Sequence, residues 1–377
     1  MNKTSRKVFM ADLSEPALHA PRVTFWPASK LLDLSPRTGI GNRDRPVLRA
    51  FYRTLVLSTR RVSPRSMPPL NSERIVSRFL PALGLFIVGI SPTLQAQDLE
   101  PRSYSNSPIG LNFVVAGYGY ASGDVLTDPS LPLENVSNAS HVGVFGFATT
   151  FRAFSQSGKF DVIVPYAALS ARGLVNGLPR ERIVDGFADP AFRVSINFIG
   201  APALTAAEFK NYRQDFILGG SLRVTAPLGQ YDSEKLVNIG TNRWSFKPEI
   251  GCSKAFGRWT AEIAPAAAFY TDNGNFFGGQ SREVAPLYSL QSHLSYTFMP
   301  GGWAAINAAY FVGSRSTTNG LENDDQQEGM RFGATIALPV NRYQSVKLYG
   351  ITGYNAHRHH DFAAVGVAWQ IRWGGGY

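Results

Sequence analysis

Residues 244–253 read Trp244-Ser-Phe-Lys-Pro-Glu-Ile-Gly-Cys-Ser253, and their side chains alternate in character along the whole run. The even-numbered positions are apolar or aromatic, and the odd-numbered positions are polar, charged or glycine. A β-strand points successive side chains to opposite faces of its sheet. This run therefore predicts a strand with apolar surroundings on one face and water on the other.

The same alternation recurs from residue 109 to the end of the chain. In residues 285–298, for example, Tyr288, Leu290 and Leu294 oppose Gln291 and His293. Repeated runs of this kind, separated by turn residues, are typical of a membrane β-barrel. The predicted strands cover residues 109–121, 141–155, 159–170, 186–199, 214–227, 244–255, 258–271, 285–298, 302–313, 329–340, 344–355 and 361–373.

The links between these runs alternate between short and long. Bacterial outer-membrane barrels have short periplasmic turns, long outer loops and an even number of strands. We therefore predict an all-β fold, a transmembrane up-and-down antiparallel β-barrel of about 12 strands. One link, residues 201–213, is long for a periplasmic turn, and Thr205 is placed to cap a short helix within it. The predicted outer loops are residues 122–140, 171–185, 228–243, 272–284 and 314–328.

The net positive charge of the chain lies in its N-terminal quarter. The formal net charge is +10, and residues 1–96 hold 15 basic and 5 acidic residues. Residues 97–377 hold 22 of each sign, so the folded part has no basic excess that would favour nucleic acid. The single cysteine, Cys252, excludes an internal disulfide and a metal site built from several cysteines.

A short apolar segment precedes the alternating runs. Residues 79–90 form an apolar run of 12 residues, too short for a transmembrane helix, which needs about 20. Arg74 and Arg78 precede the run, and residues 91–96 follow it, with the small residue Ala96 at the expected cleavage point before Gln97. A basic, then apolar, then small-residue order is typical of a secretory signal peptide.

These features divide the chain into three parts. Residues 67–96 are predicted to be the cleavable signal peptide, with Met67 at a suitable distance to be the start. Residues 1–66 are a basic upstream extension, either the product of a misplaced start or a genuine disordered segment. Residues 97–377 are predicted to form the barrel in the outer membrane.

The polar face of the strands supplies the candidate lumen residues. A charged side chain on the lipid face costs about 2–4 kcal/mol near the bilayer midplane, so charged groups are expected to face inward. Such residues either line a channel or form a pairing network that braces the barrel. The candidates are Arg193, Ser195, Asn197, Arg223, Lys247, Glu249, Glu262, Gln291, His293, Arg331, Gln370 and Arg372.

Two other groups of residues suggest hydrolysis or metal binding. His293 and Ser295 share a strand face, as in some outer-membrane lipid deacylases, but here that face is the polar one and points inward. His357, His359 and His360 lie together in a predicted outer loop and either bind Zn²⁺ or Cu²⁺ or form a solvated hairpin tip. We predict no catalytic site, metal or cofactor.

The chain ends with an aromatic residue in register with an apolar strand face. Trp369, Ile371, Trp373 and Tyr377 have the same parity. This pattern resembles the C-terminal signal that the barrel-assembly machinery reads. The predicted partners are therefore that machinery, outer-membrane lipid and a small organic substrate, without nucleic acid.

Several stretches resemble the outer-membrane transporter family named for the meta pathway of phenol degradation. The Asn-Arg-Trp-Ser-Phe-Lys-Pro-Glu run at residues 242–249 is the most specific of them, and the likeness spans about residues 98–377. The resemblance implies a barrel that passes small, aromatic or hydrophobic compounds, and the family has no catalytic residues. The matching stretches are Asp98–Asn106, Gly186–Pro190, Thr225–Tyr231, Asn238–Glu249 and Thr271–Asn273.

We therefore expect a passive outer-membrane channel for uptake or export of small organic molecules, not an enzyme. About twelve strands lie between filled 8-stranded barrels and aqueous porins of 16–18 strands, so a narrow or loop-constricted lumen is expected. Two alternatives stay open. One is a lipid-modifying hydrolase that uses His293 and Ser295, and the other is a structural or surface-binding barrel with a closed lumen.

Overall fold

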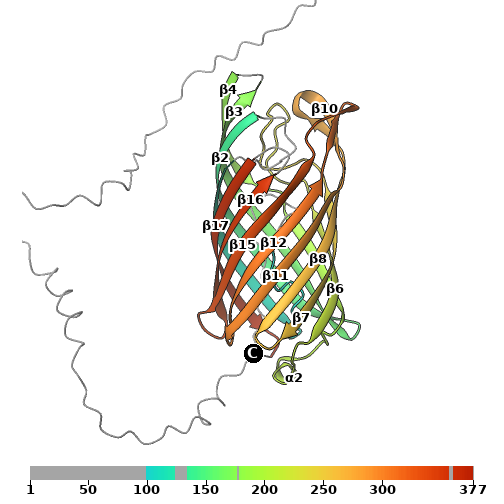
Figure 1. Ribbon diagram of the computed structural model, residues 1–377, viewed down its shortest axis with the longest axis vertical. Coiled ribbons are helices and arrows are strands. Elements are labelled where there is room, and N and C mark those ends of the chain that lie inside the picture. Colours follow the sequence, from blue (N-terminus) through green and yellow to red (C-terminus); the bar gives the residue numbers. More distant parts are fainter. Residues whose placement is uncertain (1–98, 124–133, 176–177, 356–359, 377) are drawn as a thin grey trace, which may run out of the picture. The chain divides into compact units, whose positions relative to one another are not determined.

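The computed structural model describes residues 99–123, 134–175, 178–355 and 360–376. They form a closed antiparallel barrel in which twelve strand positions follow the order of the chain. The first and last strands pair with each other from Leu111↔Gly374 to Gly123↔Phe362, which closes the sheet (Figure 1). Closure leaves no open sheet edge, as a barrel in hydrocarbon requires. The predicted twelve-stranded barrel is confirmed.

Eleven of the twelve positions hold one strand each, and the twelfth is shared. Both β4 and β5 pair with β3, one above the other. The predicted strand 186–199 is thus interrupted at residues 188–190, because Pro190 has no N–H to donate to the ladder. The barrel strands are β1 (Leu111–Gly123), β2 (Glu134–Ala153), β3 (Gln156–Val175), β4 (Leu178–Phe187), β5 (Ala191–Ile199), β6 (Phe216–Thr225), β7 (Ser245–Phe256), β8 (Trp259–Tyr270), β11 (Leu287–Met299), β12 (Gly302–Gly313), β15 (Gln327–Pro339), β16 (Gln344–Asn355) and β17 (His360–Gly374).

The two ends of the barrel differ as the link lengths predict. We call the end with tight turns, such as the one at Gly257, the short-turn end, and the opposite end the long-loop end. At the short-turn end lies α2 (Ala206–Phe209), which Thr205 caps (Figure 1). The Thr205 N–H and hydroxyl lower the pKa of the Glu208 carboxyl, which accepts hydrogen bonds from both. No helix among the described residues is long and apolar enough to span a membrane.

The long-loop end contains more regular structure than the sequence predicts. The predicted loop at residues 171–185 is mostly a continuation of the β3–β4 hairpin. Parts of the loops at 272–284 and 314–328 pair across the sequence into a second, four-stranded sheet. That sheet and its 3₁₀ turn comprise β9 (Asn273–Phe276), η3 (Phe277–Gly279), β10 (Gln280–Val284), β13 (Ser316–Thr318) and β14 (Leu321–Glu322).

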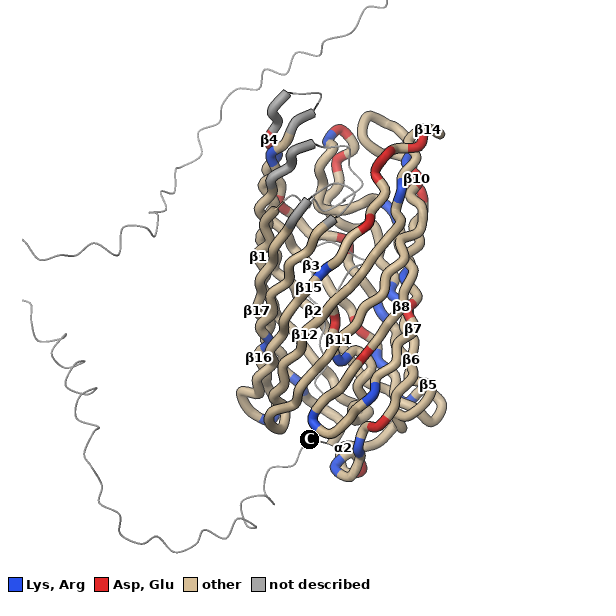
Figure 2. Tube along the Cα trace, viewed as in Figure 1, with Lys and Arg blue, Asp and Glu red and all other residues tan. Residues whose placement is uncertain are grey.

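The barrel is apolar outside and polar inside, the reverse of a soluble protein. Ile306 and Val365 are 64% and 58% exposed on the exterior, whereas Lys247 and Arg331 are buried within. Strands β11 and β12 hold no Lys, Arg, Asp or Glu, and appear as uncharged tilted strands in Figure 2. Exposed aromatic side chains form a girdle near each end, as in outer-membrane barrels. They include Tyr118, Tyr166, Trp244, Tyr288 and Tyr310 near the long-loop end and Trp259, Trp369 and Trp373 near the short-turn end.

Candidate functional site

The lumen of the barrel contains the side chains that the strand parity assigned to it. Arg193 and Glu249 are partly buried, and the others are buried within the barrel. They do not form one cluster, because they lie on strands around the whole circumference. The buried set is Ser195, Asn197, Arg223, Lys247, Glu262, Gln291, His293, Arg331, Gln370 and Arg372.

A segment that the strand pattern did not predict occupies the lumen at the short-turn end. Residues 99–108, which we call the plug, precede β1 and run inside the barrel. Tyr104 is 4% exposed and Ser107 is 0% exposed. The end of the plug is fixed to the wall through Thr150, whose hydroxyl donates to the Pro108 carbonyl at 2.8 Å and accepts from the Leu111 N–H at 2.9 Å.

An ionic network joins the start of the plug to the barrel wall. The Arg193 guanidinium lies between the carboxylates of Glu100 and Asp161, donating to Glu100 Oε1 at 3.0 Å and to Asp161 Oδ1 at 2.9 Å. Arg223 approaches Glu100 Oε2 at 3.6 Å. All four side chains are at most 12% exposed, so water screens them little. The network therefore both holds the plug and braces β3, β5 and β6.

Removing Arg193 is expected to destabilise the barrel strongly. The change Arg193→Ala leaves two carboxylates buried without their shared cation, which costs about 3–5 kcal/mol. Urea unfolding in detergent, monitored by tryptophan fluorescence, measures the free energy of unfolding of each variant. The matched control is Arg172→Ala, which removes a pair with Glu181 whose side chains are 72% and 45% exposed and should cost at most about 1 kcal/mol. Equal losses for the two variants would contradict the bracing role.

The middle of the plug is held by backbone as well as side-chain contacts. The Arg102 N–H donates to Glu262, and the Arg102 guanidinium lies 5.6 Å from the centroid of the Trp303 ring. The ammonium of Lys159 donates to the carbonyl of Ser103. Lys159 and Asp161 alternate with Phe160 in the sequence, so their parity could have added them to the lumen set.

A second segment occupies the lumen at the long-loop end. Residues 226–244 join β6 to β7, and we call them the lumen loop. Val237 and Ile239 are 7% and 1% exposed and belong to a cluster with lumen side chains of β1, β2, β3 and β4. Burial of each such side chain contributes about 1.5–3 kcal/mol. The expected loop-constricted lumen therefore has a specific constricting element.

Asp189, in the break between β4 and β5, anchors the lumen loop. Its Oδ1 accepts from the Gly229 N–H at 2.9 Å, and its Oδ2 accepts from the N–H and hydroxyl of Thr241 at 2.8 and 2.7 Å. A Cβ on Gly229 would lie 2.8 Å from the Asp189 backbone nitrogen, so the close approach requires glycine there. The carboxylate thus joins both arms of the loop to the wall.

The other sequence candidates are the His293–Ser295 pair, the histidine cluster and the exterior face of the last strand. His293 and Ser295 are buried within the barrel, and His293 Nδ1 lies 2.9 Å from Asn307 Oδ1 rather than in a hydrogen bond with the serine. His357 and His359 lie outside the described residues, as does Tyr377. Trp369 and Trp373 are 44% and 46% exposed on the exterior of β17.

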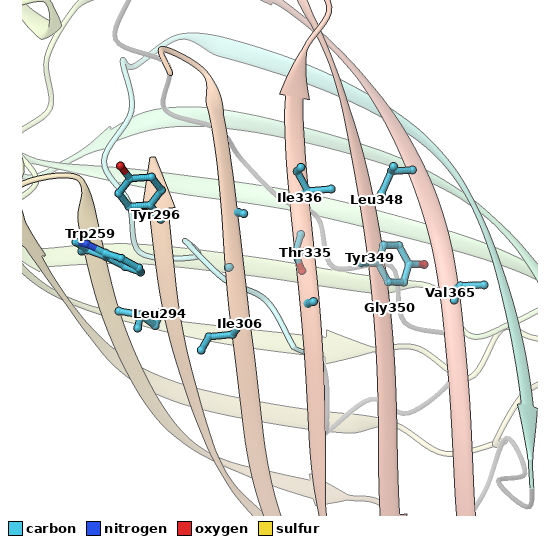
Figure 3. A pocket seen from close by; sticks show the side chains of 13 residues that line it. Trp259, Leu294, Tyr296, Ile306, Thr335, Ile336, Leu348, Tyr349, Gly350 and Val365 are labelled. Atoms are coloured by element: carbon cyan, nitrogen blue, oxygen red, sulfur yellow. The ribbon is translucent and has the colours of Figure 1, made fainter. Parts of the chain in front are cut away.

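A shallow hollow of about 680 Å³ lies on the outer wall rather than in the lumen. Its floor is set by Ala334 and Gly350, which are paired neighbours on β15 and β16. Larger side chains surround the floor, with Trp259 and Tyr296 at one edge and Val365 at the other (Figure 3). Because these side chains lie on the apolar exterior, the hollow faces membrane hydrocarbon and belongs to the membrane surface.

Comparisons with known proteins agree with the fold. The structure is similar to an outer membrane channel from Pseudomonas putida F1, with a TM-score of 0.61 and 19% identity over 73% of this chain and 99% of that chain. Weaker likenesses are to the β domain of the Bordetella autotransporter BrkA, with a TM-score of 0.42 and 9% identity over 70% of this chain and 100% of that one, and to the CymD monoaromatic hydrocarbon channel, with a TM-score of 0.40 and 7% identity over 73% and 91%. No curated protein matches the sequence.

A family model decides the classification. The model described as "Putative MetA-pathway of phenol degradation" matches residues 119–364, which is more than half of the chain. The matched part runs from β1 to β17 and contains the lumen loop and its Asp189 anchor. The chain is an outer-membrane-type β-barrel that belongs to this phenol-degradation family.

Proposed function

We propose that this protein is a passive outer-membrane channel for small organic compounds, aromatic compounds among them. The observation that carries the proposal is the way in which the lumen is filled. The wall is a complete twelve-stranded sheet, and the plug and the lumen loop that fill it add no strand to that sheet. Both can therefore move without breaking the hydrogen-bonded ladder that crosses the membrane.

The nature of the cargo rests on two lines of support. A channel from Pseudomonas putida F1 shares the fold, and the family is described by phenol degradation. The lumen also combines charged side chains with ring faces, such as Arg331 at 4.6 Å from the centroid of Phe362. A compound with one aromatic ring and one polar group finds partners for both parts in such a lumen.

The proposal includes export and assembly. Residues 67–96 would act as the cleavable signal peptide, residues 1–66 would be an upstream extension, and residues 97–377 would be the mature barrel. The exterior aromatic face of β17, with Trp369 and Trp373, would be read by the barrel-assembly machinery. Outer-membrane lipid would contact the apolar exterior.

Swelling of proteoliposomes tests the channel. Liposomes containing the mature protein are expected to swell in p-hydroxybenzoate, a small aromatic anion that phospholipid retains, faster than liposomes without protein. A larger solute such as raffinose should give no increase. If neither the wild-type protein nor a variant released from both the plug and the lumen loop admits p-hydroxybenzoate, the channel proposal fails.

A closed structural barrel is the second candidate, and the filled lumen favours it. The same experiment separates the two functions. Impermeability after removal of the plug alone does not decide between them, because the lumen loop still fills the other half of the lumen. The structural barrel is accepted only if a variant released from both fillers also stays impermeable.

A further inference from the structure

The ring of Tyr104 lies in a notch in the lumen wall. The notch is formed where Gly219 of β6 and Gly251 of β7 face each other in register. A Cβ on Gly251 would lie 2.1 Å from Cε2 of Tyr104. A Cβ on Gly219 would lie 2.8 Å from Cδ1 of Tyr104 and 2.6 Å from Oδ1 of Asn197. Only a glycine at each position leaves room for the ring, so the wall is shaped to accept a six-membered aromatic ring.

The notch also provides a partner for the hydroxyl of the ring. The Tyr104 hydroxyl donates to Glu249 Oε1 at 2.9 Å. The other oxygen of Glu249 accepts from Gln291 Nε2 at 3.2 Å and lies 3.8 Å from the Lys247 ammonium, which fixes the carboxylate in place. Ile217, Ala201 and Ala264 pack around Tyr104. The site thus combines apolar sides with an oriented carboxylate at its end.

Other glycines of the wall also lie against aromatic rings, but those contacts differ in kind. The Phe151 ring lies over Gly158, the Phe362 ring over Gly353 and the Tyr349 ring over Gly366. Each of these is a cross-strand pair within the ladder, in which a ring covers the gap left by a glycine on the next strand. Tyr104 comes from the plug instead, so this notch can be emptied while the sheet stays intact.

We propose that the notch at Gly219 and Gly251 is a binding subsite for phenols, which Tyr104 occupies while the lumen is closed. The side chain of tyrosine is p-cresol joined to the backbone, so the plug presents a tethered phenol to its own site. A free phenol that reaches the notch competes with Tyr104 and releases one of the contacts that hold the plug. The inference rests on the proposed channel function and adds to it a substrate class and a site.

Binding of p-cresol to a Tyr104→Ala variant tests the site. The substitution leaves a ring-sized space, and such spaces in proteins bind aromatic molecules of matching size. Calorimetry of the full-length mature barrel in detergent should show p-cresol binding at least tenfold tighter to Tyr104→Ala than to the wild type. Toluene has the same ring without the hydroxyl and should bind about tenfold more weakly than p-cresol, the ratio expected when a hydrogen bond to a charged acceptor is lost.

A second substitution refills the notch. Adding Gly251→Ala to Tyr104→Ala should remove the gained p-cresol affinity, because the nearest atoms to a Cβ there all belong to Tyr104. Gly219→Ala should do the same, but its Cβ also displaces the Asn197 side chain. Heat-modifiable gel mobility verifies that each variant is a folded barrel. Equal affinities for p-cresol and toluene, or p-cresol binding that both alanine substitutions leave unchanged, would overturn the subsite.

The proposed channel and the subsite can fail separately. If Tyr104→Ala admits p-hydroxybenzoate into liposomes but does not bind p-cresol, the channel stands and the subsite is wrong. If p-cresol binds in the notch but no variant admits a solute, the subsite stands and the channel is wrong.

Discussion

Removal of the plug is expected to raise the single-channel conductance of the barrel severalfold. The variant lacks residues 99–106 and keeps Ser107 and Pro108, which lead into β1. In the wild type these residues fill the short-turn half of the lumen with side chains that are largely buried, among them Tyr104 and Asn106. Without them, the same space holds water and ions. Planar-bilayer recording of the purified mature protein measures the change.

The variant is expected to remain folded and to lose less stability than Arg193→Ala. The plug supplies Glu100 to the network, and its loss leaves Arg193 facing Asp161 at 2.9 Å. Water enters the vacated lumen and hydrates the charged groups that the plug had covered, which avoids the penalty of a dry, unpaired charge. The twelve-stranded ladder loses none of its pairs, because the plug belongs to no strand.

A second variant distinguishes the effect of the side-chain contacts of the plug from the effect of a chain segment of the same length. Residues 99–106 are replaced by a Gly/Ser segment of equal length, which keeps the chain but removes Glu100, Arg102 and Tyr104. If the side-chain contacts hold the plug in the lumen, this variant should conduct as the deletion does. A conductance that neither variant raises would show that the plug is not the barrier at the short-turn end.

The wall of the barrel could be predicted from the sequence because each strand has membrane hydrocarbon on one face and the polar lumen on the other. In β7, for instance, Lys247 and Gly251 face the lumen and Ile250 is 59% exposed on the exterior, as the alternation requires. The register of a strand is fixed wherever one face must avoid water. Lumen positions such as Arg331 and Gln291 follow from the same rule.

The two fillers of the lumen could not be predicted in this way. The plug has no period, and its partners lie far along the chain, such as Glu249, which is 145 positions from Tyr104. The sequence predicts an outer loop at residues 228–243, and only the fold shows that Val237 and Ile239 within it are buried. Nothing in the alternation identifies Asp189 as an anchor, because it lies in the break between two strands.

The resemblance to the family did point to these regions. In the stretch Asp98–Asn106, residues 99–106 form most of the plug, and Gly186–Pro190 contains the Asp189 anchor. Thr225–Tyr231 and Asn238–Glu249 supply the Gly229 and Thr241 donors that bind this anchor. The stretches that carry the resemblance therefore build the elements that close the lumen, whereas the wall depends only on the alternation of side chains.

Release of the lumen loop is expected to have the second large effect, and it should depend on the plug. In the variant Asp189→Ala, Gly229 and Thr241 lose their shared carboxylate acceptor. Hydrogen bonds to a charged group contribute about 1.5–3 kcal/mol each, so the three bonds hold the loop at least as strongly as the burial of Val237 and Ile239. Among the hydrogen bonds of the loop that remain, the Gln230 N–H donates to the Phe187 carbonyl at 2.7 Å and Asn242 Nδ2 donates to Asn273 Oδ1 at 2.8 Å. These bonds join uncharged groups and contribute about 0.5–1.5 kcal/mol each.

Release of the lumen loop can be measured by proteolysis and by conductance. Trypsin should cleave after Lys235, which lies exposed in the lumen loop, at a higher rate in Asp189→Ala than in the wild type. The matched control is Asp232→Ala in the same loop. Within the described ranges the Asp232 carboxylate accepts only the exposed Glu234 N–H, so this substitution should leave cleavage unchanged. Similar cleavage rates in Asp189→Ala and the wild type would show that apolar burial alone holds the loop.

The conductance of the combined variant distinguishes two barriers in series from one. Resistances in series add, so Asp189→Ala alone should change the current little while the plug still fills the short-turn half. Together with removal of residues 99–106, it should open the whole lumen and raise the conductance on the order of tenfold, toward that of an unobstructed barrel of this size. If Asp189→Ala adds nothing to the plug deletion, the loop is no barrier to ions and the plug alone closes the channel.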